Sequence, residues 1–227
     1  GYLIAYLGDP PGYRCGVCGH CHAANFPQIQ PSPGIQGAAA HFFEEEFLPR
    51  IEKQGSEKYP IYEAGYSLSY HGGSRTGRLV RASKYEGAGP FALTLVRRAV
   101  EVIRTHYPLS AIHAIVSVPP TKSGLLVETF ARHVAATLGI EYLPVLVKLR
   151  PTQEQKELTN WVQKATNVKN AFAVQLPELV AGRTLLLIDD IYDSGYILRE
   201  VAKTLMQVGA RAVYPLTITR TNHSDNQ

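Results

Sequence analysis

The stretch LLLIDDIYDSGYIL, residues 185–198, decides the fold of this 227-residue chain. Its first four residues, Leu185 to Ile188, form a continuous apolar run, which is typical of a parallel strand that is covered on both faces. Open α/β sheets bind their ligands at the carboxyl ends of such strands. We therefore expect Asp189 and Asp190, which follow the run directly, to lie at a ligand-binding edge of the sheet.

The residues after this acidic pair predict a phosphate site. Asp193, Ser194 and Gly195 lead into a segment with helical spacing of apolar residues, so a hydroxyl group and a small residue stand where that helix begins. Backbone N–H groups and the helix dipole hold anions at such a position. The two carboxylates are then left for the hydroxyl groups of a sugar. The alternative is an acidic pair that closes a strand for another purpose, as in receiver domains that bind magnesium.

The other apolar patterns predict an α/β fold with a mostly parallel sheet and flanking helices. Strands are expected over residues 112–118, 141–149, 183–188 and 212–217, and helices over residues 91–106, 126–138 and 195–208. Strands that alternate with helices imply right-handed crossovers. Residues 64–70 alternate between apolar and polar and precede Gly72 and Gly73, which predicts a hairpin before Arg78.

Three loops are expected to meet at one edge of this sheet, after Val118, Leu149 and Ile188, because the carboxyl ends of parallel strands share an edge. After Val118, Thr121, Lys122 and Ser123 would offer a cation, hydroxyl groups and amides to a diphosphate; the alternative for Lys122 is a solvated loop lysine. Residues 150–172 are long and polar and could close over a bound ligand. The histidines at 41, 71, 106 and 133 are scattered, and we expect structural or surface roles for them.

Composition narrows the class of protein. The net charge of +4 comes from Lys and Arg spread among Asp and Glu, which favours nucleic-acid binding only weakly. No apolar run is long enough to span a membrane, and no signal peptide is recognisable, so a cytoplasmic protein is expected. The single methionine is Met206, so the sequence does not begin with an initiator methionine. We therefore expect the chain to be the carboxyl-terminal part of a longer protein or a processed form.

The three cysteines predict a zinc site near the start. Cys15, Cys18 and Cys21 form two overlapping Cys-x-x-Cys steps, and thiolates at this spacing can converge on one tetrahedral zinc ion. The fourth zinc ligand could be His20, His22 or a cysteine before Gly1. The alternative to a zinc site is a free or redox-active thiol cluster. A disulfide framework is disfavoured, because the number of cysteines is odd.

The sequence divides into three expected parts. Residues 1–26 hold the zinc-binding segment. Residues 27–36 carry three prolines and are expected to be a linker, and apolar residues at helical spacing predict a bridging helix over residues 37–53. Residues 55–227 form the α/β domain, in which residues 55–80 are expected to supply a variable hood over the site.

The segment 185–198 resembles the phosphoribosyl-pyrophosphate (PRPP) motif of type I phosphoribosyltransferases, with Ile197 where the family usually has Thr. The span 64–220 resembles the competence-related ComF-like branch of that family. Lys164 stands where that branch usually has Arg, and the loop at 121–124 lacks its arginine-rich stretch. The positions that match this branch in order are Lys84, Tyr85, Arg150, Thr152, Gln155, Leu158, Asn167 and Phe172.

This resemblance implies transfer of a phosphoribosyl group from PRPP, bound with Mg²⁺, to a nitrogenous base. It implies catalytic roles for Asp189, Asp190 and Lys122. The residues implied to contact PRPP are Asp189, Asp190, Asp193, Ser194, Gly195, Tyr196, Thr121, Ser123, Lys84 and Arg150. The alternatives are an accessory module that binds PRPP or a nucleotide with little or no turnover in DNA uptake, repair or recombination, and a DNA-contacting domain whose affinity falls steeply with salt.

Residues 2–9, YLIAYLGD, followed by the three cysteines, resemble the zinc-binding subdomain of RecQ-family DNA helicases. This resemblance implies a structural zinc ion and a RecQ-like helicase as the parent chain, with DNA as a partner of that parent. The acceptor base and the oligomeric state stay open, with a homodimer among the options.

Overall fold

The computed structural model describes residues 32–41, 47–71, 74–87, 89–120, 124–153 and 160–221, and the chain separates into two units, residues 1–41 and 42–227. In the first unit the described part is helix α2 (Pro33–His41), whose residues 33–38 are exposed. Residues 33–36, expected in a linker, therefore lie in this helix. Cys15, Cys18 and Cys21 lie outside the described residues, so the zinc site stays a prediction.

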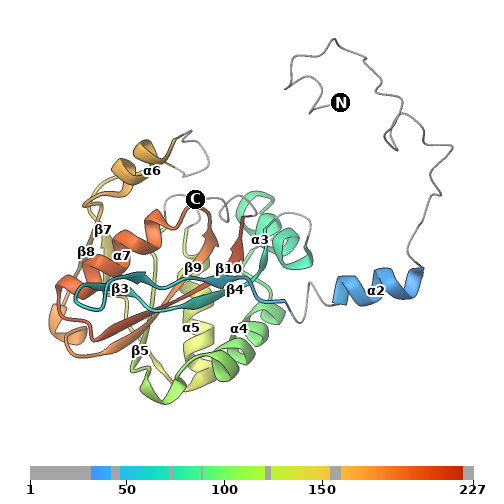
Figure 1. Ribbon diagram of the computed structural model, residues 1–227, viewed down its shortest axis with the longest axis horizontal. Helices are drawn as coiled ribbons and strands as arrows, with labels where there is room; N and C mark the ends of the chain where they lie inside the picture. Colours follow the sequence, from blue (N-terminus) through green and yellow to red (C-terminus); the bar gives the residue numbers. More distant parts are fainter. Residues whose placement is uncertain are drawn as a thin grey trace, which may run out of the picture. The chain divides into compact units, whose positions relative to one another are not determined.

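The second unit is built on a six-stranded sheet with the order β1-β4-β10-β9-β5-β6 (Figure 1). Neighbouring strands pair in parallel except for β1 and β4, which are antiparallel. The expected α/β class with a mostly parallel sheet is thereby confirmed. The strands are β1 (Arg50–Ile51), β4 (Gly65–Tyr70), β5 (Ala114–Ser117), β6 (Glu141–Tyr142), β9 (Thr184–Tyr192) and β10 (Ala212–Arg220).

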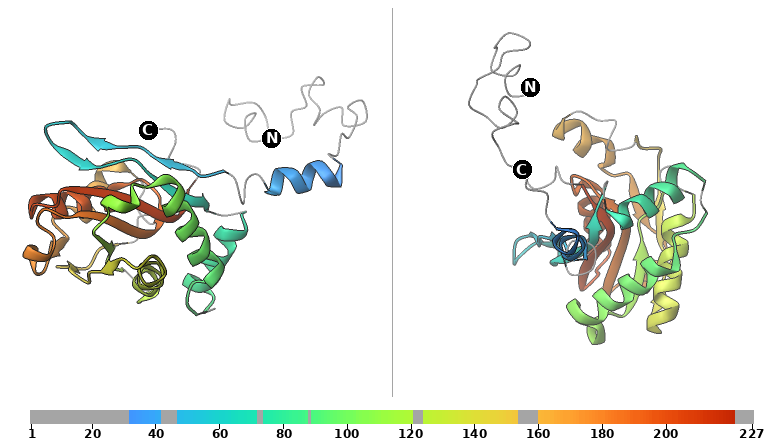
Figure 2. Two further views of the ribbon diagram at one scale, coloured as in Figure 1. Left: turned by 90° about the horizontal axis from the view of Figure 1, so that it is seen from below. Right: turned by 90° about the vertical axis from the view of Figure 1, so that its right-hand side faces the viewer.

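Helices cover both faces of the sheet. Helices α4 (Leu93–His106) and α5 (Leu126–Leu138) pack on one face, and α7 (Tyr196–Gln207) packs on the other (Figures 1 and 2). All three were predicted, because their apolar residues recur at helical spacing and those residues are the ones that become buried. Within the described residues, no helix is long and apolar enough to cross a membrane.

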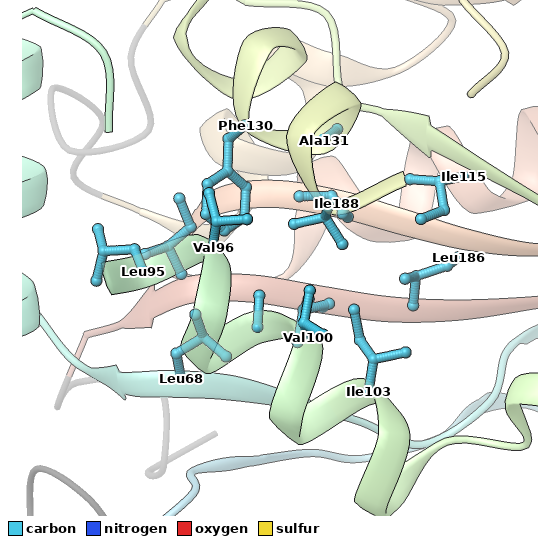
Figure 3. Packing of buried hydrophobic residues seen from close by; sticks show 14 of the residues in the cluster. Leu68, Leu95, Val96, Val100, Ile103, Ile115, Phe130, Ala131, Leu186 and Ile188 are labelled. Carbon is cyan, nitrogen blue, oxygen red and sulfur yellow. The ribbon is translucent and has the colours of Figure 1, made fainter. Parts of the chain in front are cut away.

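Strand β9 lies between two cores because its side chains alternate between the faces of the sheet. Leu186 and Ile188 pack with α4 and α5, as Figure 3 shows, whereas Leu185 and Leu187 pack with α7. All four side chains have no exposed surface. This explains why the sequence needs an uninterrupted apolar run at this strand.

The expected single strand over residues 141–149 is wrong. The chain leaves the central sheet after β6, at Pro144, which has no N–H group to donate to a neighbouring strand. It then forms β7 (Leu146–Lys148), which pairs antiparallel with β8 (Phe172–Val174) in a separate two-stranded sheet. Helix α6 (Trp161–Val168) lies between β7 and β8 in sequence.

The expected hairpin before Arg78 is also wrong. Strand β4 is followed by helix α3 (Arg75–Tyr85), which Ser74 caps by accepting a hydrogen bond from the Gly77 N–H at 2.9 Å. Because β4 belongs to the central sheet, residues 55–80 do not form one variable hood. A small hairpin of β2 (Gln54–Gly55) and β3 (Pro60–Tyr62) precedes it.

The bridging helix expected over residues 37–53 does not reach its predicted end. Pro49 has no N–H group to donate to an interior helical hydrogen bond, and Arg50 and Ile51 form the edge strand β1, with Ile51 fully buried. Two short 3₁₀ helices, η2 (Leu109–Ala111) and η4 (Pro177–Leu179), complete the described elements.

Candidate functional site

Strand β9 continues through Tyr192, so Asp189 and Asp190 lie inside the strand rather than after its end. The sequence placed the end of the strand too early, because Ile191 and Tyr192 extend it. Alternation along the strand directs Asp189 to the α7 face and Asp190 to the α4 face. Both residues are largely buried, with 6% and 8% of their surface exposed, and both line a cavity.

This cavity has a volume of about 470 Å³ and lies at the carboxyl edge of the sheet. The turn from β9 into α7 forms much of its wall. Val118 and the two prolines after it line the cavity, as does Gln153 in the segment after Leu149. The expected meeting of these three loops at one edge is therefore confirmed for their described residues.

Lys84 of α3 forms an ion pair with Asp190. Its Nζ atom lies 2.7 Å from Asp190 Oδ2, and the two side chains are only 16% and 11% exposed. Burial is the largest single effect on the pKa of Lys84 and lowers it, but the charge and hydrogen bond of Asp190, together with the charges of Tyr85 and Asp189, raise this pKa by more in sum, so the net shift is upward. Lys84 therefore stays charged beside the acid, as a cation inside the cavity.

The electrostatic environment of Asp189 differs from that of its neighbour. Burial, reinforced by the charge of Asp190, raises the pKa of Asp189 to about 8. The Asp190 N–H, which donates to Asp189 Oδ1 at 2.9 Å, and the cations of Lys84 and Lys148 act in the opposite direction. At neutral pH, Asp189 is mostly protonated and able to donate a hydrogen bond.

The turn that follows β9 is shaped to receive an anion. Gly195 has φ +74° and precedes α7; a Cβ atom at this position would lie 2.7 Å from the Tyr192 hydroxyl oxygen. The Ser194 hydroxyl is buried, and among the described residues it has no hydrogen-bond partner. A buried hydroxyl without a partner is costly, which marks this turn as a place for a polar ligand atom.

Asp193 is held from two sides. Its Oδ2 atom pairs with Lys164 Nζ of α6 at 2.8 Å, and its Oδ1 atom accepts a hydrogen bond from the Thr221 hydroxyl at 3.0 Å. Both carboxylate oxygens are thus engaged inside the protein. Asp193 and Tyr196, both predicted to contact the ligand, line the cavity. The contacts of Asp193 with Lys164 and Thr221 hold the turn in position.

The other predicted contacts are placed differently. Thr121, Lys122 and Ser123 lie outside the described residues. Arg150 is not among the described residues that line the cavity, because its Nη2 atom donates to the carbonyl oxygens of Lys169 at 2.8 Å and of Thr166 at 3.4 Å. It therefore ties the segment after β7 to the end of α6.

Sequence reasoning missed several residues of the cavity wall. Lys148 lies with its Nζ atom 3.4 Å from the Pro120 carbonyl oxygen and 5.6 Å from the centre of the Phe172 ring, and burial lowers its pKa. His71 and Thr221 follow β4 and β10 and also line the cavity. The order of the strands would have indicated both, since β4, β10 and β9 are neighbours in the sheet.

No model of a known protein family matches the chain. A segment of 76 residues is 36% identical to the DNA utilization protein YhgH of Escherichia coli K12, and it covers 34% of this chain and 32% of that protein. The match thus spans about a third of the length of this relative.

Two solved structures share part of the arrangement of strands and helices. Adenine phosphoribosyltransferase from Saccharomyces cerevisiae is 14% identical, with a TM-score of 0.42 over 82% of this chain and 91% of that one. Glutamine PRPP amidotransferase from B. subtilis, in complex with ADP and GMP, is 17% identical, with a TM-score of 0.42 over 61% and 30%. At such low sequence identities and TM-scores, neither structure defines the chemistry of this chain.

Proposed function

We propose that this domain binds PRPP as its magnesium complex and transfers the phosphoribosyl group to a nitrogenous base. The observation that carries the proposal is the turn between β9 and α7, where a buried Ser194 hydroxyl without a described partner follows two acidic residues at the edge of a parallel sheet. The resemblance of residues 185–198 to the PRPP motif supports the same assignment.

The 5′-phosphate binds at the turn. The N–H groups at the start of the twelve-residue helix α7, together with its dipole, attract the anion. The Ser194 hydroxyl supplies a further hydrogen bond. Gly195 keeps the space beside Tyr192 clear, so that the backbone comes close to the phosphate.

The pentose lies over the acidic pair. Asp190 accepts hydrogen bonds from the ribose hydroxyl groups, while the protonated Asp189 carboxyl group is able to donate one. Lys84, which neutralises Asp190 in this structure, then provides positive charge for the diphosphate. Lys122, Thr121 and Ser123 are proposed to complete the diphosphate site.

The chemistry consists mainly of positioning and charge stabilisation. The bond from C1′ to the diphosphate breaks through an oxocarbenium-like state, and a ring nitrogen of the base attacks C1′. Mg²⁺ would enter as part of the substrate and would supply positive charge that stabilises the departing diphosphate. Among the described residues, no group of three or more His, Cys, Asp or Glu side chains is arranged to hold a metal ion by itself.

A second candidate function is an accessory module that binds PRPP or a nucleotide without turnover in DNA metabolism. Two observations favour it. Ile197 stands where the family usually places a phosphate-binding Thr, and the 76-residue match is to a DNA utilization protein. This module would bind PRPP and release no diphosphate.

The test is calorimetric titration with Mg·PRPP, followed by an assay of diphosphate release with a panel of purine and pyrimidine bases. Loss of one hydrogen bond to a charged group predicts that Ser194→Ala weakens PRPP binding by about tenfold or more. Ser110→Ala, at an exposed serine in η2 before β5, is the matched control. Equal PRPP affinity in both variants would exclude the turn as the phosphate site, and binding without release would favour the accessory module.

A further inference from the structure

His71 lies at the end of β4 and lines the cavity. Its backbone N–H donates to the Arg220 carbonyl oxygen at 2.7 Å, which continues the pairing of β4 with β10 by one residue. Its Nδ1 atom lies 3.1 Å from the Thr219 hydroxyl oxygen. The imidazole is therefore held in place through both its backbone and one ring nitrogen.

The direction of the Thr219 hydrogen bonds indicates that Nδ1 of His71 carries a proton. The Thr219 hydroxyl lies 3.3 Å from the Asp190 carbonyl oxygen, which only accepts hydrogen bonds. Because a threonine hydroxyl has one hydrogen, donation to Asp190 leaves Thr219 as the acceptor from His71 Nδ1–H. In a neutral imidazole with a proton on Nδ1, the other nitrogen, Nε2, is the basic atom.

We propose that Nε2 of His71 is the general base that takes the proton from the acceptor nitrogen. The inference rests on the proposed transfer reaction. The lone pair of the acceptor nitrogen forms the bond to C1′ as the C1′–O bond breaks, and the diphosphate leaves with that electron pair. The N–H proton of the acceptor moves to Nε2, and the resulting imidazolium later releases it to water.

The neighbouring ionisable groups are less suited to this role. Lys84 of α3 and Asp190 of β9 are paired with each other, and both oxygens of Asp193 are engaged. Asp189 carries its own proton at neutral pH. Arg220, next to Thr219 on β10, is a permanent cation that lies 5.1 Å from the centre of the Tyr192 ring.

Lys148, on the β7 side of the cavity, is the competing base, because burial lowers its pKa. The variant Lys148→Met therefore belongs in the same experiments. If the proton-transfer step depends on Lys148 rather than on His71, the assignment to His71 is overturned.

The first measurement is nitrogen NMR of the ligand-free protein with labelled histidines, in which His71→Gln assigns the signal. The expected result is a neutral His71 with its proton on Nδ1. Thr219→Val, which keeps the shape but removes the hydroxyl group, should convert this signal to a mixture of tautomers. A His71 with its proton on Nε2 in the wild-type protein would overturn the inference, whatever the outcome for PRPP.

The second measurement is the pH dependence of diphosphate release from PRPP with the base that the wild-type protein accepts best. For the wild type, the rate should rise with pH as His71 loses its proton. General-base contributions predict that His71→Gln lowers this rate about 100-fold and removes the acidic limb, with PRPP affinity changed less than about threefold. His133→Gln, at an exposed histidine of α5, should behave as wild type.

The two proposals fail in different ways. If the wild-type protein releases diphosphate and His71→Gln keeps the acidic limb, only the role of His71 is overturned. If the wild-type protein binds PRPP but releases no diphosphate with any base of the panel, the transfer reaction fails and this role for His71 fails with it. The tautomer of His71 measured in the ligand-free protein still tests its hydrogen bond with Thr219, because that measurement does not depend on PRPP.

Discussion

At the scale of single residues, the informative feature is that two adjacent carboxyl groups lie in different electrostatic environments. Asp190 forms an ion pair with Lys84 at 2.7 Å, whereas burial and the charge of Asp190 raise the pKa of Asp189 to about 8 and keep it mostly protonated at neutral pH. Alternation along β9 produces this difference, because it gives each carboxyl group its own face of the sheet. One acid is then an acceptor and the other a donor toward the same ligand.

This difference predicts a pH-dependent stability. The pKa of Asp189 rises from its usual value of 3.8 to about 8 on folding, so the folded protein binds this proton more tightly than the unfolded chain does. The contribution of this proton to the free energy of unfolding is fully present below about pH 3.8. It is lost progressively as the pH rises from there to about 8. We expect Asp189→Asn, which cannot ionise, to lose less unfolding free energy than wild type over this range, as urea denaturation would measure.

Asp190→Asn serves as the contrasting variant. It leaves the Lys84 ammonium group buried without its partner, so we expect it to destabilise the protein by roughly 2–4 kcal/mol. If Asp189→Asn keeps the pH dependence of the wild type, Asp189 is ionised in the folded protein and the proposed donor role is wrong.

Gly195 gives a second prediction at this scale. Gly195→Ala should cost about 1–2 kcal/mol from the left-handed backbone and more from the contact with Tyr192. Gly182→Ala is the matched control, since its φ of +72° is nearly the same and no atom lies within 4 Å of the added Cβ. Calorimetric PRPP affinity should fall only for Gly195→Ala. An equal loss of unfolding free energy in both variants would show that the Tyr192 side chain moves away from the added Cβ atom at no energetic cost.

At the scale of elements, the turn between β9 and α7 is held by two other parts of the chain. Lys164 connects it to α6, and Thr221 connects it to the end of β10. The position of the turn therefore depends on whether α6 is in place. This links the segment after β7, which was predicted to close over the ligand, to the phosphate site.

The variant Lys164→Met tests this link. The pair is about a fifth to a quarter exposed, so its contribution is modest, and we expect PRPP affinity to fall roughly three- to tenfold. Hydrogen exchange of the amides of α6 should become faster because the tether is lost. Lys169→Met, at the exposed C-cap of the same helix, should leave both measurements unchanged. Unchanged exchange in Lys164→Met would show that other contacts hold α6.

The success of sequence reasoning differed between elements for physical reasons. Strand β9 and the helices α4, α5 and α7 were predictable because their burial follows a simple period of apolar residues. Helix α3 was missed because its sequence is mostly polar and only Gly77 and Val80 are buried. The departure of the chain from the sheet at Pro144 depends on pairing with β8, which lies 28 to 30 residues further along.

The candidate site was predictable to the extent that it is local in sequence. The acidic pair and the turn around Ser194 could be recognised from one stretch, and Lys84 from the family resemblance. His71, Lys148 and Thr221 could not, because they come together only through the order β4-β10-β9 and the position of β7. The zinc site at Cys15, Cys18 and Cys21 stays a prediction from the sequence.

At the scale of the whole α/β unit, the cavity sits at the edge of a sheet that is packed on both faces. Leu185 and Leu187 enter one core and Leu186 and Ile188 the other, directly before the acidic pair. The site is therefore carried by a strand that is buried over seven consecutive residues, Thr184 to Asp190, which favours a rigid arrangement of the carboxyl groups. Unfolding of this strand would remove the site altogether.

It follows that PRPP should stabilise the whole α/β unit rather than its turn alone. At a concentration of about 100 times the dissociation constant, binding to the folded state adds about 2.7 kcal/mol to the free energy of unfolding. We expect Mg·PRPP to raise the melting temperature, and ribose 5-phosphate and diphosphate alone to raise it less, since each fills only part of the cavity. Differential scanning calorimetry with each ligand measures these increments.

A core variant separates this effect from general stability. Leu186→Ala, in the fully buried core beneath α4 and α5, should destabilise the protein by about 2–5 kcal/mol. Because Leu186 is not among the residues that line the cavity, the increment from PRPP should be the same as in wild type. Ser194→Ala should show the reverse, with a small loss of stability and a much smaller increment. If diphosphate alone gives the full increment of PRPP, the site recognises only the leaving group, and the assignment of the β9–α7 turn to the 5′-phosphate is wrong.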